Sequence, residues 1–298
     1  MEKSNTKQIF YSKFLCAIIV LAFSCFAFNV KAQESWPHIV ESNDGTQISY
    51  EVYGSGEPSL VFVHGWSCDS RYWKEQVPFF SEDYRIILID LAGHGHSGMT
   101  REKYSMKSFG EDVKAVVEAA GCQNIILIGH SMGGPVIAEA SRLMPGHVKG
   151  IIGVETFENI EYPLSLDELN AMMAPFRENF QAGTRQFVQQ MLNPDTNPLL
   201  CEWIIADMAA APQHVALSSM EESLLPFVTG EAAKIFDDLH IPVYVVKGDL
   251  WPVDFEANRR HMHSFNAIEI KSADHFLMMN KPDEFNKALN QAIEYLSK

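Results

Sequence analysis

Six short, almost uniformly apolar runs recur along this chain and restrict its fold more than any other feature. They occupy residues 60–63, 86–89, 125–128, 151–154, 243–246 and 267–270. A strand with one solvent-exposed face alternates polar and apolar side chains. Continuous apolar runs instead suit a parallel sheet that is covered on both faces. Helical patterns between most runs, such as 109–120 and 135–143, can supply the crossovers that parallel strands require. The sequence therefore predicts an α/β fold with a doubly wound, mostly parallel sheet.

Two departures from this alternation give the chain its predicted organisation. Residues 38–42 and 47–53 alternate and are joined through Asn43-Asp44-Gly45, so we expect an antiparallel lead-in to the sheet. Between residues 157 and 235 the apolar spacing is helical throughout, and prolines divide it into short helices. We interpret 33–156 and 236–298 as two parts of one core. Residues 157–235 are then an all-helical lid inserted over the carboxyl edge of the sheet, where open α/β sheets place their ligand sites. A helical subdomain remote from that edge is the alternative.

The first 32 residues have the features of a secretory signal peptide. Lys3, Lys7 and Lys13 precede an apolar run over residues 14–28, and small residues end at Ala32. We expect cleavage near Ala32 and a secreted or periplasmic mature protein. No later apolar run reaches the ~18 residues that a spanning helix needs, so no stable membrane span is expected after cleavage. An uncleaved anchor, or a lipid anchor at Cys25, stays open.

Composition and charge exclude several classes of protein. With 47% hydrophobic residues, 18 Gly and 14 Pro, the chain is neither collagen-like nor wholly disordered. Its net charge of −15, which becomes more negative without the N-terminal lysines, disfavours nucleic acid as a partner. Cys68, Cys122 and Cys201 lack CxxC spacing, so a disulfide framework is not indicated. His261 and His263 have no third ligand nearby in the sequence, and neither a metal nor another cofactor is expected.

The third apolar run passes directly into a Gly-x-Ser-x-Gly sequence and then into a helical pattern. Residues 129–134 read Gly-His-Ser-Met-Gly-Gly. In a strand-to-helix turn this tight, a Cβ at Gly129 or Gly133 would strike a neighbouring element. The turn lifts Ser131 clear of the sheet and sets it near a helix N-terminus, whose N–H groups and dipole favour a developing oxyanion. Ser131 is therefore the candidate nucleophile.

Three further motifs accompany this turn. His64-Gly65-Trp66 follows the first apolar run, a Gly-rich segment at 90–98 follows the second, and Asp274-His275-Phe276 lies near the end. The four motifs, in this order, resemble the α/β-hydrolase superfamily. Within it the chain is most similar to the lid-bearing serine esterase, lactonase and cofactor-free haloperoxidase branch. The resemblance covers nearly all of residues 38–298.

The resemblance implies roles for individual residues. Ser131 would be the nucleophile and His275 the base that takes and returns its proton. The backbone N–H groups of Trp66 and Met132 would form the oxyanion hole, and His64 would support the oxyanion loop. Because Ser stands at the elbow, the dehalogenase and epoxide-hydrolase branches, which use Asp there, are disfavoured.

The third member of the expected triad departs from the family pattern. After the strand at 242–246 the family usually reads Gly-x-x-Asp, but here Trp251 stands where the carboxylate should be. Asp249, two residues earlier, is the first choice. Glu155, at the tip of the strand at 151–154, is the alternative, because some relatives take the acid from that neighbouring strand. Asp254 reads as a helix start and is the last candidate.

We expect a hydrolase that cleaves a small or medium, fairly apolar carboxylic ester or lactone through an acyl-enzyme on Ser131. Hydrolysis of C–C or amide bonds, or perhydrolysis with the same triad, is the alternative, because fold and triad do not fix the substrate. The Trp at position 251 motivates a third hypothesis, a ligand sensor with slow turnover. The sequence leaves the oligomeric state open.

Overall fold

A computed structural model describes residues 37–297 of the chain, and the predicted signal peptide lies outside the described residues. Eight strands of the described part form one sheet, in the order β1-β2-β4-β3-β5-β6-β7-β8. Their bounds are β1 His38–Glu41, β2 Gln47–Tyr53, β3 Ser59–Val63, β4 Ile86–Asp90, β5 Ile125–His130, β6 Val148–Val154, β7 Pro242–Lys247 and β8 Ser264–Glu269.

The sheet is parallel except at one edge. β1 pairs with β2 and β2 with β4 in antiparallel fashion, and every later pair is parallel. The predicted α/β class, the doubly wound sheet and the antiparallel lead-in are therefore confirmed. β8 begins at Ser264, three residues before the predicted run, because it is an edge strand with one partner and is only partly buried. Half-buried strands need no continuous apolar run.

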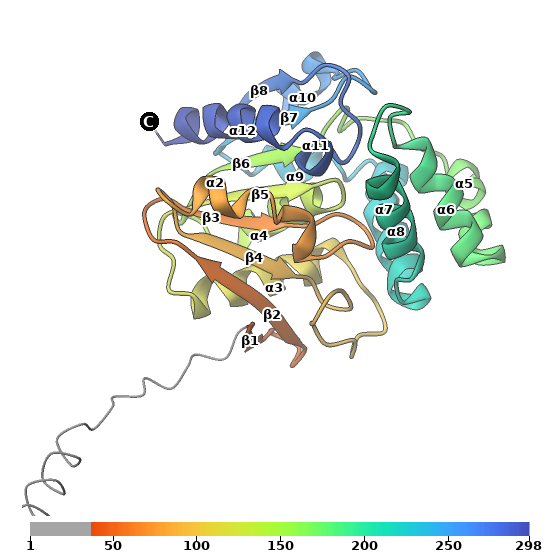
Figure 1. The fold of residues 1–298 in the computed structure, drawn as a ribbon, viewed down its shortest axis with the longest axis horizontal. Coiled ribbons are helices and arrows are strands. Elements are labelled where there is room, and N and C mark those ends of the chain that lie inside the picture. Colours follow the sequence, from red (N-terminus) through yellow and green to blue (C-terminus); the bar gives the residue numbers. More distant parts are fainter. Residues whose placement is uncertain (1–36, 298) are drawn as a thin grey trace, which may run out of the picture. The chain divides into compact units, whose positions relative to one another are not determined.

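Helices cover both faces of the sheet. α3 (Met106–Ala119) and α4 (Gly133–Leu143) pack against each other behind the sheet, and α12 (Pro282–Leu296) lies in front of it against β7 and β6 (Figure 1). The shorter elements are η1 Ser70–Trp73, α2 Val77–Phe80, α10 Phe255–His261 and α11 Leu277–Asn280. The strand side chains between the helical layers form the core. β3, β4 and β5 are buried along their whole length.

The chain between β6 and β7 is mostly helical and is called the helical insertion below. It contains α5 Leu166–Glu178, α6 Phe180–Gln190, α7 Pro198–Ala209, α8 Gln213–Thr229 and the short α9 Lys234–Asp237. Ser165 and Asn179 cap the first two of these helices with their side-chain oxygens, and Pro198 opens the third. α5 to α8 gather beyond the carboxyl ends of the parallel strands (Figure 1). None of the helices within residues 37–297 combines the length and the hydropathy needed to cross a membrane.

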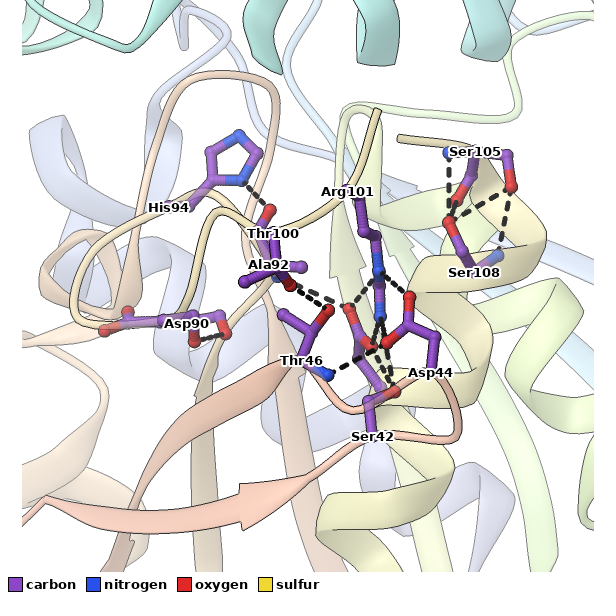
Figure 2. A network of polar contacts seen from close by, with 12 residues as sticks. Ser42, Asp44, Thr46, Asp90, Ala92, His94, Thr100, Arg101, Ser105 and Ser108 are labelled. Atoms are coloured by element: carbon purple, nitrogen blue, oxygen red, sulfur yellow. Dashed lines mark hydrogen bonds and ion pairs between the residues drawn. The ribbon is translucent and has the colours of Figure 1, made fainter. Parts of the chain in front are cut away.

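A buried arginine connects the turn between β1 and β2 to the loop that follows β4 (Figure 2). The guanidinium of Arg101 is 5% exposed, and it donates to Asp112 at 2.9 Å and to Asp44 at 2.5 Å. Ser42 Oγ also donates to Asp112, at 2.6 Å. The hydrogen bond from Arg101 lowers the pKa of Asp44 to about 2. A buried charge is tolerated here because both of its partners are carboxylates. The network therefore fixes the base of the loop at 91–105, which reaches α8 through Gly93.

Candidate active site

Ser131 occupies a left-handed backbone conformation at the end of β5, with φ of +52°. Its N–H donates to Val154 O at 2.9 Å, and its carbonyl accepts from Gly134 N at 2.9 Å. A Cβ built on Gly133 would lie 2.6 Å from Val63 O, and one on Gly129 would press against the Gly133 carbonyl. Two glycines are thus required for the turn to close, as the sequence predicts. A non-glycine residue at such a φ carries strain of about 1–3 kcal/mol, and such strain clusters at functional sites.

Ser131 lines a cavity of about 1530 Å³ between the sheet and the helical insertion. Asp249 does not line the same cavity, whereas five further sequence candidates do: Trp66, Met132, Glu155, Asp254 and His275. Methionines directly after α6 and within α7 and α8 line part of its wall: Met191, Met208 and Met220. The cavity is therefore a largely apolar chamber with one strained serine at its floor.

Two carboxylates compete for the position beside the imidazole, and the geometry favours Glu155 over Asp249. Glu155 Oε2 lies 3.5 Å from His275 Nδ1, and the two side chains are 1% and 9% exposed. Its other oxygen, Oε1, accepts the backbone N–H of Gly248. Asp249 is exposed, and a hydrogen bond from the backbone of Ser272 lowers its pKa. The chain turns after β7 so that Asp249 faces this neighbouring loop rather than the cavity.

The third acid candidate, Asp254, has a structural task. Its side chain accepts from Ala257 N at 2.9 Å and caps α10, as the sequence predicts. Trp251, which stands where the family pattern has an acid, places its ring 5.6 Å from the ring of His275 in an edge-to-face contact.

The loop that carries His275 is held from two sides. His130 Nε2 lies 2.8 Å from the carbonyl oxygen of His275, and the two rings lie 4.8 Å apart. Burial lowers the pKa of His130 well below its usual value, so its ring is neutral and donates from Nε2. From the helical insertion, Met191 O accepts the N–H of His275 at 3.2 Å. No hydrogen bond joins Ser131 Oγ to His275 among the described residues, and such bonds often tighten only when substrate is present.

Two backbone donors beside Ser131 are left available. Within residues 37–297, neither the N–H of Trp66 nor that of Met132 donates to another protein group. Met132 directly precedes α4, so its N–H belongs to the positive end of that helix. His64 is fully buried, accepts Leu91 N at its Nε2 at 3.0 Å, and has its pKa lowered by burial. As a neutral ring, it therefore supports the start of the loop that carries Trp66.

The side chain of Trp66 connects this loop to the helical insertion. Its Nε1 donates to Ala216 O of α8 at 2.7 Å. Its ring makes edge contacts with three phenylalanines of α5 and α6, with centroid distances of 5.4, 6.3 and 5.9 Å: Phe176, Phe180 and Phe187. The insertion therefore contacts both the loop that carries Trp66 and the loop that carries His275.

Sequence reasoning missed the positioning roles of His130 and Lys247. Lys247 is 2% exposed, and its Nζ donates to the carbonyls of Gly248 and Trp251. It thereby fixes the turn after β7. A lysine that ends an otherwise apolar strand was the available signal for Lys247, and the position directly before the elbow serine was the signal for His130.

No cluster of three or more histidine, cysteine or acidic side chains that could hold a metal ion occurs within residues 37–297. Cys68, Cys122 and Cys201 are free thiols.

The sequence of the chain matches a family model and several known proteins. A sequence model described as the alpha/beta hydrolase fold matches residues 58–213. A non-heme haloperoxidase of Rhodococcus erythropolis is 37% identical over 112 residues, which are 37% of this chain and 39% of that protein. A bifunctional esterase/perhydrolase of Acinetobacter calcoaceticus is 38% identical over 101 residues, 33% of this chain and 37% of that protein. The matches thus span less than half of either relative.

The similarity in structure extends further along the chain. The crystal structure of a bromoperoxidase from Bacillus anthracis superposes with a TM-score of 0.76, at 22% identity, over 86% of this chain and 99% of that one. At this identity the likeness supports the fold alone. With the family model matching more than half of its length, the chain belongs to the α/β-hydrolase family.

Proposed function

We propose that this protein is a serine hydrolase that cleaves a small or medium, fairly apolar carboxylic ester or lactone through an acyl-enzyme on Ser131. The observation that carries the proposal is the meeting of three groups at one cavity. A strained serine faces it, His275 lines it, and the Nδ1 of that histidine lies 3.5 Å from Glu155. The activities named for the relatives, which include an esterase, support hydrolysis of an ester bond.

In the acylation step, Ser131 Oγ attacks the carbonyl carbon of the ester. His275 takes the serine proton at Nε2, because Nδ1 is the nitrogen directed at Glu155. The carboxylate then stabilises the charged imidazolium. The N–H groups of Trp66 and Met132 donate to the oxyanion, and each such donor is typically worth about 3 kcal/mol in the transition state. The leaving alcohol departs with the proton that His275 returns.

In the deacylation step, a water molecule attacks the acyl carbon and His275 takes its proton. The C–O bond to Ser131 breaks, the serine recovers its proton, and a carboxylic acid leaves. The apolar side chains that line the cavity suit the uncharged part of an acyl or alcohol group. We propose that α5 to α8 act as the lid over this chamber.

The proposal is tested with p-nitrophenyl esters of graded length and with a fluorophosphonate probe that labels activated serines. The wild-type protein is expected to turn over the esters many times and to carry the label on Ser131 by mass spectrometry. Ser131→Ala is expected to lose both activities while it keeps its cooperative unfolding. Full esterase activity in Ser131→Ala would refute the mechanism.

Perhydrolysis is the second candidate function, because one relative carries a bifunctional esterase/perhydrolase name and another a haloperoxidase name. In that reaction hydrogen peroxide replaces water at the acyl-enzyme and a peracid leaves. The rates of acid and peracid formation from one ester in the presence of peroxide separate the two. Glu155 lies 3.5 Å from His275 Nδ1 and can supply the carboxylate that is missing at position 251. This favours the hydrolase over the ligand sensor with slow turnover.

We further propose that residues 1–32 direct export and are removed near Ala32. Sequencing the N-terminus of the protein recovered from its native host checks this, with Gln33 expected as the first residue.

A further inference from the structure

The charged side chains that line the cavity are mostly acidic. Among the described residues only two cations line it, Arg142 and Lys234. Besides Glu155, six carboxylates do: Glu139, Glu158, Glu231, Asp238, Asp254 and Glu256. Each of the two cations already has a carboxylate partner, since Arg142 pairs with Glu139 at 3.4 Å and Lys234 with Glu231 at 2.6 Å. The remaining carboxylates give the chamber a negative field, and low-dielectric walls strengthen such a field inside a cleft.

Glu158 is the carboxylate of this group that lies nearest in sequence to the triad candidate Glu155, and its backbone is clamped on both sides. Asp254 N donates to Glu158 O at 2.7 Å. Asn258, which is fully buried, donates to Phe157 O at 2.6 Å and accepts Ile160 N at 3.2 Å. Three hydrogen bonds, one to the N-cap of α10 and two to Asn258 within that helix, therefore fix the segment that presents Glu158 to the cavity.

No cation of the described chain forms an ion pair with Glu158. Burial raises the pKa of this carboxyl, and the nearby charge of Glu155 raises it further, while the charges of His275 and Lys247 act in the opposite direction. Its ionised form is thus held at some cost beside the reacting groups. A positive charge on a bound molecule would compensate that cost.

Two aromatic side chains also line the cavity. Trp251 is 39% exposed and Tyr162 is 55% exposed, although large aromatic side chains are usually buried. Aromatic faces attract cations, and the attraction is largest for Trp. Carboxylates and partly exposed aromatic rings together form a lining that suits an ammonium group and repels a carboxylate.

From this arrangement we infer the substrate class of the site: an ester or lactone that carries a positively charged group, with Glu158 as the residue that selects for it. The inference rests on the proposed ester hydrolysis and names the charge of its substrate. Neutral esters remain substrates, and repulsion makes esters that carry a carboxylate the poorest substrates.

The experiment uses three butyrate esters that differ in the charge of the alcohol and hardly in its size. They are the choline ester, its uncharged 3,3-dimethylbutyl isostere and a 3-carboxypropyl ester. A second series of three p-nitrophenyl esters places the charge on the acyl half. In at least one series, kcat/KM is expected to fall by about tenfold from cation to neutral ester and again to the anion, and the cation preference is expected to shrink with added salt.

Two variants with the same change in net charge assign the effect. Glu158→Gln is expected to reduce the ratio of cationic to neutral kcat/KM by about threefold or more. Glu178→Gln, which removes an exposed carboxylate of α5 outside the cavity lining, is expected to leave the ratio unchanged.

Each outcome decides a different question. Neutral esters hydrolysed fastest in both series, through Ser131, would overturn the inference and leave the proposed function standing. An equal loss of preference in both variants would also overturn the role of Glu158. If none of the esters is hydrolysed, the proposed function fails and the inference fails with it.

Discussion

Replacing Glu155 by Gln removes one charge from the site and keeps the shape of the side chain. In the structure His275 Nδ1 lies 3.5 Å from this carboxylate, and in the proposed mechanism an imidazolium forms there during acylation. At an effective dielectric constant of about 20, two unit charges at that distance attract each other by about 5 kcal/mol. This corresponds to a factor of about 3,000 in rate, since each 1.36 kcal/mol is tenfold.

We therefore expect kcat of Glu155→Gln to fall by about three orders of magnitude on an activated ester, with a much smaller change in KM. The glutamine oxygen can still accept the N–H of Gly248, so the turn after β7 should persist. Unfolding in urea, followed by tryptophan fluorescence, checks that the variant keeps most of its stability.

Asp249→Asn is the matched control, because it also converts one carboxylate to an amide, at the residue after Gly248, whose N–H Glu155 accepts. Asp249 is exposed, so less than about a threefold loss is expected. A large loss in Asp249→Asn with near-normal activity in Glu155→Gln would refute the assignment of the acid.

Three further predictions concern stability. Gly133→Ala is expected to destabilise the protein by about 3 kcal/mol in urea, because the new Cβ would lie 2.6 Å from Val63 O; an unchanged midpoint would show that the turn relaxes. Trp66→Phe loses the hydrogen bond to Ala216, worth about 1 kcal/mol, and Tm should fall by about 2–4 °C. In the same variant kcat is expected to fall, with a smaller change in KM. Burial lowers the pKa of His261, but its hydrogen bonds to two carboxylates outweigh this and raise it. This stabilisation is complete below the unfolded pKa of about 6.5 and is lost as pH rises through the folded pKa, so the Tm difference between wild type and His261→Gln should shrink with rising pH. A difference that grows with pH would contradict the sign.

The parts of the fold that sequence reasoning identified are local ones. The strand before Ser131 and the two glycines around it lie within ten residues of each other, so a local pattern is enough to identify the turn. The parallel strands were equally readable, because burial on both faces demands an unbroken apolar run. β8 was placed three residues late, since only one of its edges is paired.

The sequence does not decide which carboxylate faces His275, because the orientation of each side chain depends on contacts between distant segments. Glu155 has φ of +50°, a conformation that no local pattern in its neighbourhood predicts. Its partner, Gly248, lies 93 residues further along the chain. The link between Trp66 and Ala216 spans 150 residues and was likewise invisible to periodicity. Such contacts follow from the packing of whole elements and not from any one motif.

The attachment of the helical insertion at two points of the site bears on attempts to shorten this protein. Met191 receives the N–H of His275, and α8 receives the indole of Trp66. A truncated version that kept only the sheet and its flanking helices would retain every residue of the proposed chemistry. It would nevertheless lose the supports that orient two of them, so the smallest working catalyst includes the segment that looks most dispensable.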